Sequence, residues 1–230
     1  MASQGAGGPK DEATVALYYK KSLQTWKKEA DDGDSKAALW AALVYERKLV
    51  PDSSPEKSVP YLLQAAESGN LTAQGLLAFK YRDGLGVPQD AAKAVEWFEK
   101  AASRKDLGAV MELGIMFRDG KYLPPDREKA FHWFEKGAEW KDPYSMAALA
   151  DMLLEGTPSA EQAARALALY REAAAAGYFP AALKAAELLQ NGKGGELDAD
   201  EAYRLLRRVA DATGDPKAMY MLAQVYYTRG

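Results

Sequence analysis

The sequence predicts an all-α protein assembled from antiparallel helix pairs, about twelve helices in total. Two observations predict this fold: a period of 36 residues, and columns of small and large apolar residues that return at helical spacing within each period. One position of the period is held by Gly33, Gly69, Lys105, Lys141 and Gly177, each 36 residues after the one before. Gly214 stands 37 residues after Gly177, so the last unit carries one inserted residue near Thr213.

The first helix of each unit is predicted to carry an apolar stripe with steps of four residues. A small residue opens this stripe, at Ala37, Ala73, Ala109, Ser145, Ala181 and Ala218. Apolar residues follow four and eight positions later, as Leu77 and Tyr81 do in the second unit, so one face of the helix is apolar. Glycine then ends the helix in a left-handed conformation, at Gly84, Gly120, Gly156 and Gly192.

The second helix of each unit follows a loop and a capping aspartate. We expect the side chains of Asp90, Asp126 and Asp200 to accept hydrogen bonds from the free N–H groups at the start of this helix. A small column, Ala94, Ala130, Ala166 and Ala202, lies three residues before a large one, Trp97, Trp133, Leu169 and Leu205. Small residues let two helices approach closely while large ones fill the space beside them, which indicates antiparallel pairs packed side by side.

These columns resemble Sel-one-like repeats, relatives of the tetratricopeptide repeat, and Ala73 to Lys105 is the best match. The resemblance covers nearly the whole chain from about residue 13 onward. It implies a right-handed α-solenoid with a curved stack of helix pairs. Members of the family mostly act as adaptors or scaffolds that hold other proteins, and some bacterial members inhibit toxic proteins. The first full unit departs from the pattern at Lys48 and Ser58, which replace a loop glycine and a small residue, and the fourth has Leu169 instead of an aromatic residue.

Unpaired helices are expected at both ends of the repeat array. We expect a flexible tail over residues 1–12 and one repeat domain over residues 13–230. The domain is expected to contain a lone helix at 13–30, five helix pairs over 35–214 and a terminal helix at 216–228. Tyr220, Tyr226 and Tyr227 give the terminal helix an aromatic edge that could contact a partner. The alternative is that this helix simply caps the array.

Composition and charge argue against several function classes. A formal charge of −3 and a pI near 5.4 create no positive field for nucleic acid. Basic pairs such as Lys20-Lys21 are expected to form a solvated helix face. Because no run of about eighteen apolar residues is present, we expect no membrane insertion. The chain has no cysteine, and its one histidine, His132, lies outside any catalytic motif, so we expect no enzyme, no metal and no cofactor.

The opening residues leave the compartment open. The stretch MASQGAGGPKDE has neither the charged head nor the apolar run of a secretory signal. It is interpreted as a ragged terminus, and a linker left after removal of an export signal is the alternative. We expect the bacterial periplasm, with the export signal absent or removed, ahead of the cytoplasm.

The partner is expected to be another protein held in a concave groove. Positions two, three and six after the small residue of each first helix point away from the buried stripe. The predicted partner-binding residues are Leu39, Trp40, Leu43, Leu76, Phe79, Arg82, Met111, Ile115 and Arg118. Later in the chain the groove turns polar, with Asp151, Lys184 and Glu187. The alternative is that these side chains pack between neighbouring first helices.

Two functions remain open from the sequence. In the first, the chain binds a partner in the groove as an adaptor, or as an inhibitor or immunity-type protein against a secreted effector. In the second, it is a structural scaffold or assembly factor in a bacterial envelope complex and acts through its ends. Large apolar and arginine side chains are common anchors of protein interfaces, which favours the groove.

Overall fold

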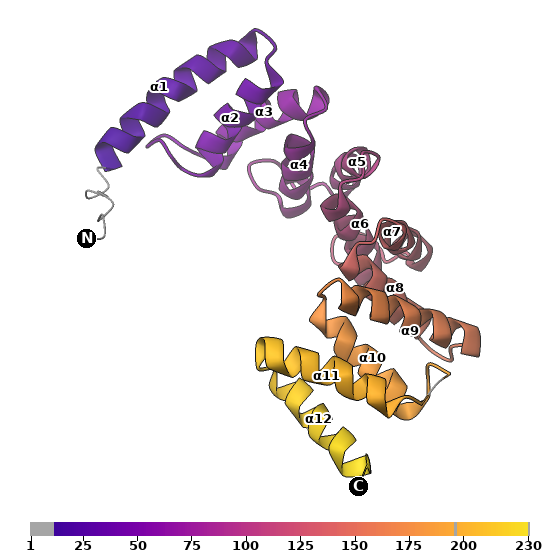
Figure 1. Cartoon of the computed structure of the whole chain (residues 1–230). Coiled ribbons are helices and arrows are strands. Elements are labelled where there is room, and N and C mark those ends of the chain that lie inside the picture. The colour runs from indigo at the N-terminus through magenta and orange to yellow at the C-terminus, as the bar shows by residue number, and fades with distance from the viewer. Residues whose placement is uncertain (1–11, 196, 230) are drawn as a thin grey trace, which may run out of the picture. The chain divides into compact units, whose positions relative to one another are not determined.

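The computed structural model describes residues 12–195 and 197–229, and helix is the only regular secondary structure within them (Figure 1). The chain divides after Ala109 into two compact units, each of which contains several repeats. From here on, the first unit is the part that ends at Ala109 and the second unit is the part that begins at Val110. The helices before the division are α1 (Glu12–Asp31), α2 (Ser35–Glu46), α3 (Pro55–Glu67), α4 (Leu71–Asp83) and α5 (Ala91–Ala102), and α6 (Leu107–Asp119) contains it. The helices after it are α7 (Arg127–Glu139), α8 (Pro143–Leu153), α9 (Ala160–Ala175), α10 (Phe179–Asn191), α11 (Ala199–Thr213) and α12 (Pro216–Arg229).

These helices confirm the predicted all-α repeat fold. The lone helix expected at 13–30 corresponds to α1, and the terminal helix expected at 216–228 corresponds to α12. Residues 1–11 of the expected tail lie outside the described residues. A single domain over 13–230 stays a prediction.

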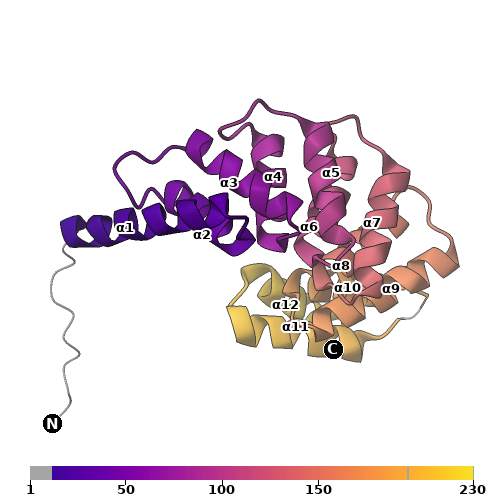
Figure 2. The same ribbon diagram turned by 90° about the horizontal axis from the view of Figure 1, so that it is seen from above.

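In the first unit, α1 packs against α2, α2 against α3, α3 against α4 and α4 against α5 (Figure 2). Connections of a few residues make neighbouring helices antiparallel. Where α1 meets α2, a buried cluster contains Leu23, Ala41, Val44, Tyr45 and Val50. α1 therefore packs on α2 as the second helix of a repeat would.

In the first compact unit, an ion pair with a buried lysine accommodates Ser58, one of the residues that depart from the repeat pattern. Lys80 of α4 is only 4% exposed, although Met116 and Met152 hold the equivalent position in later repeats. Its ammonium group lies 2.7 Å from a carboxylate oxygen of Glu46. Ser58, which replaces the small apolar residue, donates a hydrogen bond to the same carboxylate. The substitution is compatible with folding because the buried charge and hydroxyl are both paired.

The second unit packs in the same sequential order, from α7 on α8 to α11 on α12. Its core holds large apolar side chains that are less than 2% exposed, among them Leu113, Phe134, Leu149, Tyr170, Leu189 and Leu206. Close approach depends on small residues: a Cβ atom added to Gly114 of α6 would lie 2.7 Å from a ring carbon of Phe134 on α7. This contact joins the two helices of a pair through Phe134, the residue after Trp133 of the predicted large column.

The recurring glycine position adopts the left-handed conformation in every repeat. The φ angles are positive at Gly33, Gly69, Lys105, Lys141, Gly177 and Gly214. At Lys105 and Lys141 the φ angles are 63° and 61°, and this conformation is sterically unfavourable because both residues carry a Cβ atom. Lys48, which replaces a loop glycine, also has a positive φ of 53°. The position is therefore defined by its backbone conformation, and the backbone adopts it even without glycine.

Replacing Lys105 by glycine is expected to raise the free energy of unfolding by up to about 1.6 kcal/mol. Glycine removes a steric cost of roughly 1–2 kcal/mol, and the more flexible unfolded chain returns about 0.4–1 kcal/mol of it. Urea unfolding followed by circular dichroism measures the change. Lys21→Gly, in the interior of α1, is the control and is expected to lose about 1 kcal/mol. The same sign for both variants would contradict the assignment.

Aspartate side chains cap the second helices α5, α7 and α11, with one correction to the prediction. Asp90 and Asp126 each accept a hydrogen bond from the backbone N–H three residues later, as predicted. The prediction of Asp200 as a cap is wrong, because Asp198 caps α11 by accepting from the N–H of residue 201. Asp198 stands four residues before Ala202, the same spacing that joins the other caps to their small column.

Candidate partner-binding surface

The predicted partner-binding residues of the first unit lie on two helices, and none of them is buried. They are Leu39, Trp40 and Leu43 on α2, and Leu76, Phe79 and Arg82 on α4. Trp40 is the most accessible, with 50% of its surface exposed. Its ring stacks on Trp26 of α1, with the ring centroids 5.9 Å apart and the planes at 25°. The stack restricts the orientation of Trp40 while half of its surface stays in solvent.

Phe79 and Arg82 are half-buried and already contact other side chains. The Phe79 ring meets Phe98 of α5 edge to face, with 5.1 Å between centroids. The Arg82 guanidinium lies 4.7 Å from the Phe79 ring centroid and 2.7 Å from a carboxylate oxygen of Asp83. Phe79 is therefore partly packed between helices, and a carboxylate on a partner would compete with Asp83 for Arg82.

Met111, Ile115 and Arg118 are the predicted residues in the second unit, and all three are half-buried on α6. The Arg118 guanidinium nitrogen lies 2.6 Å from the Asp119 carboxylate, and its carbon lies 5.6 Å from the Phe134 ring centroid. The hydrogen bond to Asp119 is the main factor that raises the pKa of Arg118. Arg82 and Arg118, one repeat apart, thus share one arrangement: each pairs with the next aspartate and lies over a phenylalanine ring.

A hollow of about 180 Å³ lies beside the first helices α8 and α10 of the second unit. Its lining includes Arg118, Tyr144, Asp151, Tyr178 and Lys184, together with small residues of both helices. The Tyr144 and Tyr178 rings meet edge to face at 6.1 Å, and Lys184 forms an ion pair with Asp151. The predicted polar positions Asp151 and Lys184 are therefore in direct contact, in a hollow with two aromatic rings.

Sequence reasoning missed Tyr144 and Tyr178. Tyr178 occupies the N-cap position that the other first helices fill with Asp34, Asn70, Asp106, Asp142 and Asp215. The Tyr178 side chain makes no capping hydrogen bond. The break in the column of capping residues was the signal that could have identified this position. Tyr144 had no comparable signal, because it lies in a column of mixed residue types.

Tyr170 of α9 is a buried hydrogen-bond donor to Asp151. This tyrosine is 1% exposed, and its hydroxyl donates a hydrogen bond to the Asp151 carboxylate. Burial raises the pKa of the Tyr170 phenol well above its usual value, and the hydrogen bond to Asp151 adds to the effect. The phenol therefore stays protonated, and Asp151 accepts from both Tyr170 and Lys184.

Tyr170→Phe is expected to lower the free energy of unfolding by about 1.5–3 kcal/mol at neutral pH, because a hydrogen bond to a charged acceptor is lost. The folded phenol keeps a proton that the unfolded chain releases above pH of about 10, so the advantage of wild type is complete below that pH and shrinks above it. Urea unfolding of both proteins on each side of that pH measures the difference, with the exposed Tyr220→Phe as the control. A difference that stays constant across this range would contradict the assignment.

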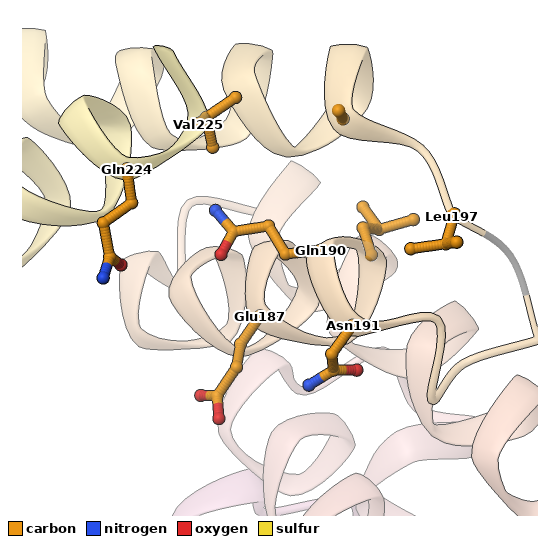
Figure 3. Close-up of a pocket in the computed structure, with 8 residues that line it drawn as sticks. Glu187, Gln190, Asn191, Leu197, Gln224 and Val225 are labelled. Carbon is orange, nitrogen blue, oxygen red and sulfur yellow. The ribbon is translucent and has the colours of Figure 1, made fainter. Parts of the chain in front are cut away.

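A larger hollow, about 510 Å³, lies between the end of α10, the start of α11 and α12 (Figure 3). Glu187, Gln190, Asn191 and Gln224 bring carboxylate and amide groups to its lining, and Leu197 adds an apolar side chain. The amide nitrogen of Gln190 is buried and has no hydrogen-bond partner. Glu187, the third predicted polar residue, thus lines a different hollow from Asp151 and Lys184.

Residues with catalytic or metal-binding chemistry are scattered. His132 is exposed on α7, with its ring 5.3 Å from that of the adjacent Trp133. Within residues 12–195 and 197–229, no three His, Cys, Asp or Glu side chains gather in a way that could hold a metal ion. In that same part of the chain, no helix has the length and apolar character needed to cross a membrane.

Solved structures similar to this chain are repeat proteins from bacteria, whereas no curated protein matches it. The protective antigen c5321 of uropathogenic Escherichia coli, which has an SLR fold, is 26% identical over 95% of this chain, with a TM-score of 0.73. The match spans half of that protein's length. A Sel1 repeat protein from Oxalobacter formigenes is 23% identical over 91% of this chain and 85% of its own, with a TM-score of 0.69. The immunity protein Pa5087 from Pseudomonas aeruginosa, 20% identical over 89% of this chain and 80% of its own, has a TM-score of 0.41, which is too low to support an argument about function.

The Sel1 repeat model matches most of the chain. The matched segments are residues 44–70, 72–106, 108–139, 143–178, 180–213 and 216–230. The boundaries follow the repeat found in the structure, since the segments from residue 72 onward start at or next to the beginning of a first helix. The chain therefore belongs to the Sel1 repeat family.

Proposed function

We propose that the chain is a non-enzymatic protein-binding module that holds a partner protein through the exposed face of its first helices, with Trp40 as an anchor. Sel1 repeat proteins are protein-interaction modules, which supports binding as the general function. The observation that carries the proposal is Trp40 itself, half exposed and oriented by its stack on Trp26. A large aromatic residue that is oriented before binding loses little conformational entropy on contact.

The rest of the surface in each unit supplies different chemistry. In the first unit, half-buried Leu43 and Phe79 add apolar area near the arginine of the Arg82–Asp83 pair. In the second unit, the hollow places Arg118 and Lys184, each paired with an aspartate, next to aromatic rings. A partner suited to these surfaces presents apolar side chains together with carboxylates. Binding of such a partner fits a role of this chain as an adaptor, or as an inhibitor or immunity-type protein against a secreted effector.

A structural scaffold that acts through its ends is the second candidate function. One observation favours it: α12 carries Tyr220, Tyr226 and Tyr227, which are all more than half exposed. Large exposed aromatic side chains on one helix are typical of an interaction site. Under this alternative, replacing the three tyrosines by serine would abolish binding, and replacing Trp40 would not.

Co-purification with quantitative mass spectrometry tests the proposed function. Tagged wild type, Trp40→Ser and Leu85→Ser are compared in extracts of the organism that encodes the chain. Leu85 is the matched control because it is 52% exposed but lies in the loop after α4. A partner held by wild type and by Leu85→Ser, and lost with folded Trp40→Ser, is the expected result. Equal recovery of every partner by Trp40→Ser would refute the role of this residue.

A further inference from the structure

An apolar stripe on α12 is exposed at positions that are covered in the other first helices. The stripe consists of Met219, Ala223 and Tyr226, which follow one another at helical spacing. Met219 is 51% exposed and Tyr226 is 57% exposed, and Ala223 is exposed as well. We call these three residues the α12 stripe.

The equivalent residues show what normally happens to this face. They are Ala38, Ala42 and Tyr45 on α2; Gln74, Ala78 and Tyr81 on α4; Val110, Gly114 and Phe117 on α6; Met146, Ala150 and Leu153 on α8; and Ala182, Ala186 and Leu189 on α10. All of these are buried except Tyr81, which is half-buried. The exposure of the α12 stripe therefore differs from the pattern of the five equivalent helices.

In the pair of α6 and α7, the second helix supplies the side chain that covers this face of the first helix. In the pair of α6 and α7, the Phe134 ring lies against Gly114, where an added Cβ atom would be 2.7 Å from the ring. Large residues recur at the Phe134 position in every second helix from α3 to α11, as Leu62, Phe98, Phe134, Tyr170 and Leu206, and all are at most 1% exposed. Ala223 of α12 is the small residue that would receive such a side chain.

A lysine of the second helix makes a second recurring contact. The Lys93 ammonium lies 5.3 Å from the Tyr81 ring centroid, and the Lys129 ammonium lies 5.0 Å from the Phe117 ring centroid. Tyr226 occupies the same position on α12, where its ring meets Tyr203 of α11 edge to face and still has 57% of its surface exposed. A cation at the matching position of a covering helix would gain the same attraction to the ring.

We propose that the α12 stripe is a docking site for an amphipathic helix of a partner protein that has the chemistry of this chain's own second helices. Such a helix has an acidic N-cap, a lysine three residues later and a Phe, Tyr or Leu eight residues after the cap, as Asp90, Lys93 and Phe98 are spaced. The lysine lies over Tyr226, and the large apolar side chain lies on Ala223. This site is separate from Trp40 and does not depend on the proposed function.

A peptide of residues 90–105, with blocked ends and a fluorescent label, is a direct probe of the site. Fluorescence anisotropy with the full chain is expected to show saturable binding of one peptide per chain. The same peptide with Phe98→Glu is expected not to bind, because it would bury a charge against Ala223. Absence of saturation up to about 1 mM peptide, or equal binding of the two peptides, would overturn the proposal.

Two variants of the full chain locate the binding on the α12 stripe. Ala223→Glu is expected to weaken peptide binding by roughly tenfold or more, since the glutamate would lie against the apolar side chain of the peptide. Lys217→Glu is the matched control, because it introduces the same side chain at an exposed position of the same helix that lies outside the stripe. Equal loss with both variants would overturn the assignment. Sedimentation of the peptide-free chain is the last measurement: a dimer that Ala223→Glu dissociates would assign the stripe to a second copy and contradict a partner helix.

Discussion

Phe134→Ala is expected to lower the free energy of unfolding by about 3–5 kcal/mol, the largest effect of any single change considered for this chain. Phe134 is fully buried, contacts the Gly114 position and has its ring 6.3 Å from that of Tyr144. Removing the ring leaves a cavity that the rigid backbone at Gly114 cannot fill. Chemical unfolding of the purified protein measures the loss.

The neighbouring His132→Ala is the control for this prediction. His132 is exposed on the same helix, so its removal is expected to change the free energy of unfolding by less than about 0.5 kcal/mol. Similar losses for the two variants would mean that Phe134 does not occupy the core position assigned to it.

Gly137→Ala is expected to destabilise the protein by about 1–3 kcal/mol, although alanine is the better helix former. A Cβ atom at Gly137 would lie 2.5 Å from the Cβ atom of Ser145 and closer still to its hydroxyl. The preceding repeat places Ala101 and Ala109 at these two positions, and both are buried. The pair of Gly137 and Ser145 therefore replaces an alanine pair with a smaller and a larger residue.

A double-mutant cycle tests this interpretation. Ser145→Ala removes the hydroxyl, so Gly137→Ala combined with Ser145→Ala recreates the alanine pair of the preceding repeat and is expected to recover part of the stability lost by Gly137→Ala alone, since the contact between the two Cβ atoms remains. A coupling of about 0.5–3 kcal/mol between the two changes is the expected result. Additive effects of the two changes would mean that the two positions do not meet across the pair.

The fold was predictable from the sequence because repetition supplies six independent examples of the same local chemistry. The left-handed position at Lys105 and Lys141, for example, is recognised by its register with Gly69 and Gly177 and not by its residue type. Asp200 was assigned as a cap because it lies near the start of a helix, but the spacing to Ala202 selects Asp198. The repeat register therefore identifies the capping residue, and nearness to the helix start does not.

The candidate surface was less predictable, because side-chain contacts within a repeat decide which groups stay accessible. The prediction places Trp40 and Phe79 on the same face of their first helices, three and six residues after the small residue, yet Phe79 packs on Phe98 while Trp40 remains half exposed. Pairing of Arg82 with the adjacent Asp83 depends on the rotamers of both side chains, which no spacing reveals. Helical spacing therefore identifies a face, and tertiary packing determines the anchors on it.

Photo-crosslinking from position 40 tests the central claim most directly. A photoreactive phenylalanine analogue replaces Trp40 in one protein and Leu85, equally exposed in the loop after α4, in the other. The account predicts that irradiation in extracts of the encoding organism yields a covalent adduct with one partner protein from position 40 and none from position 85. Adducts with that partner from position 85 alone, from both positions equally, or from neither would contradict the claim that Trp40 anchors a bound protein.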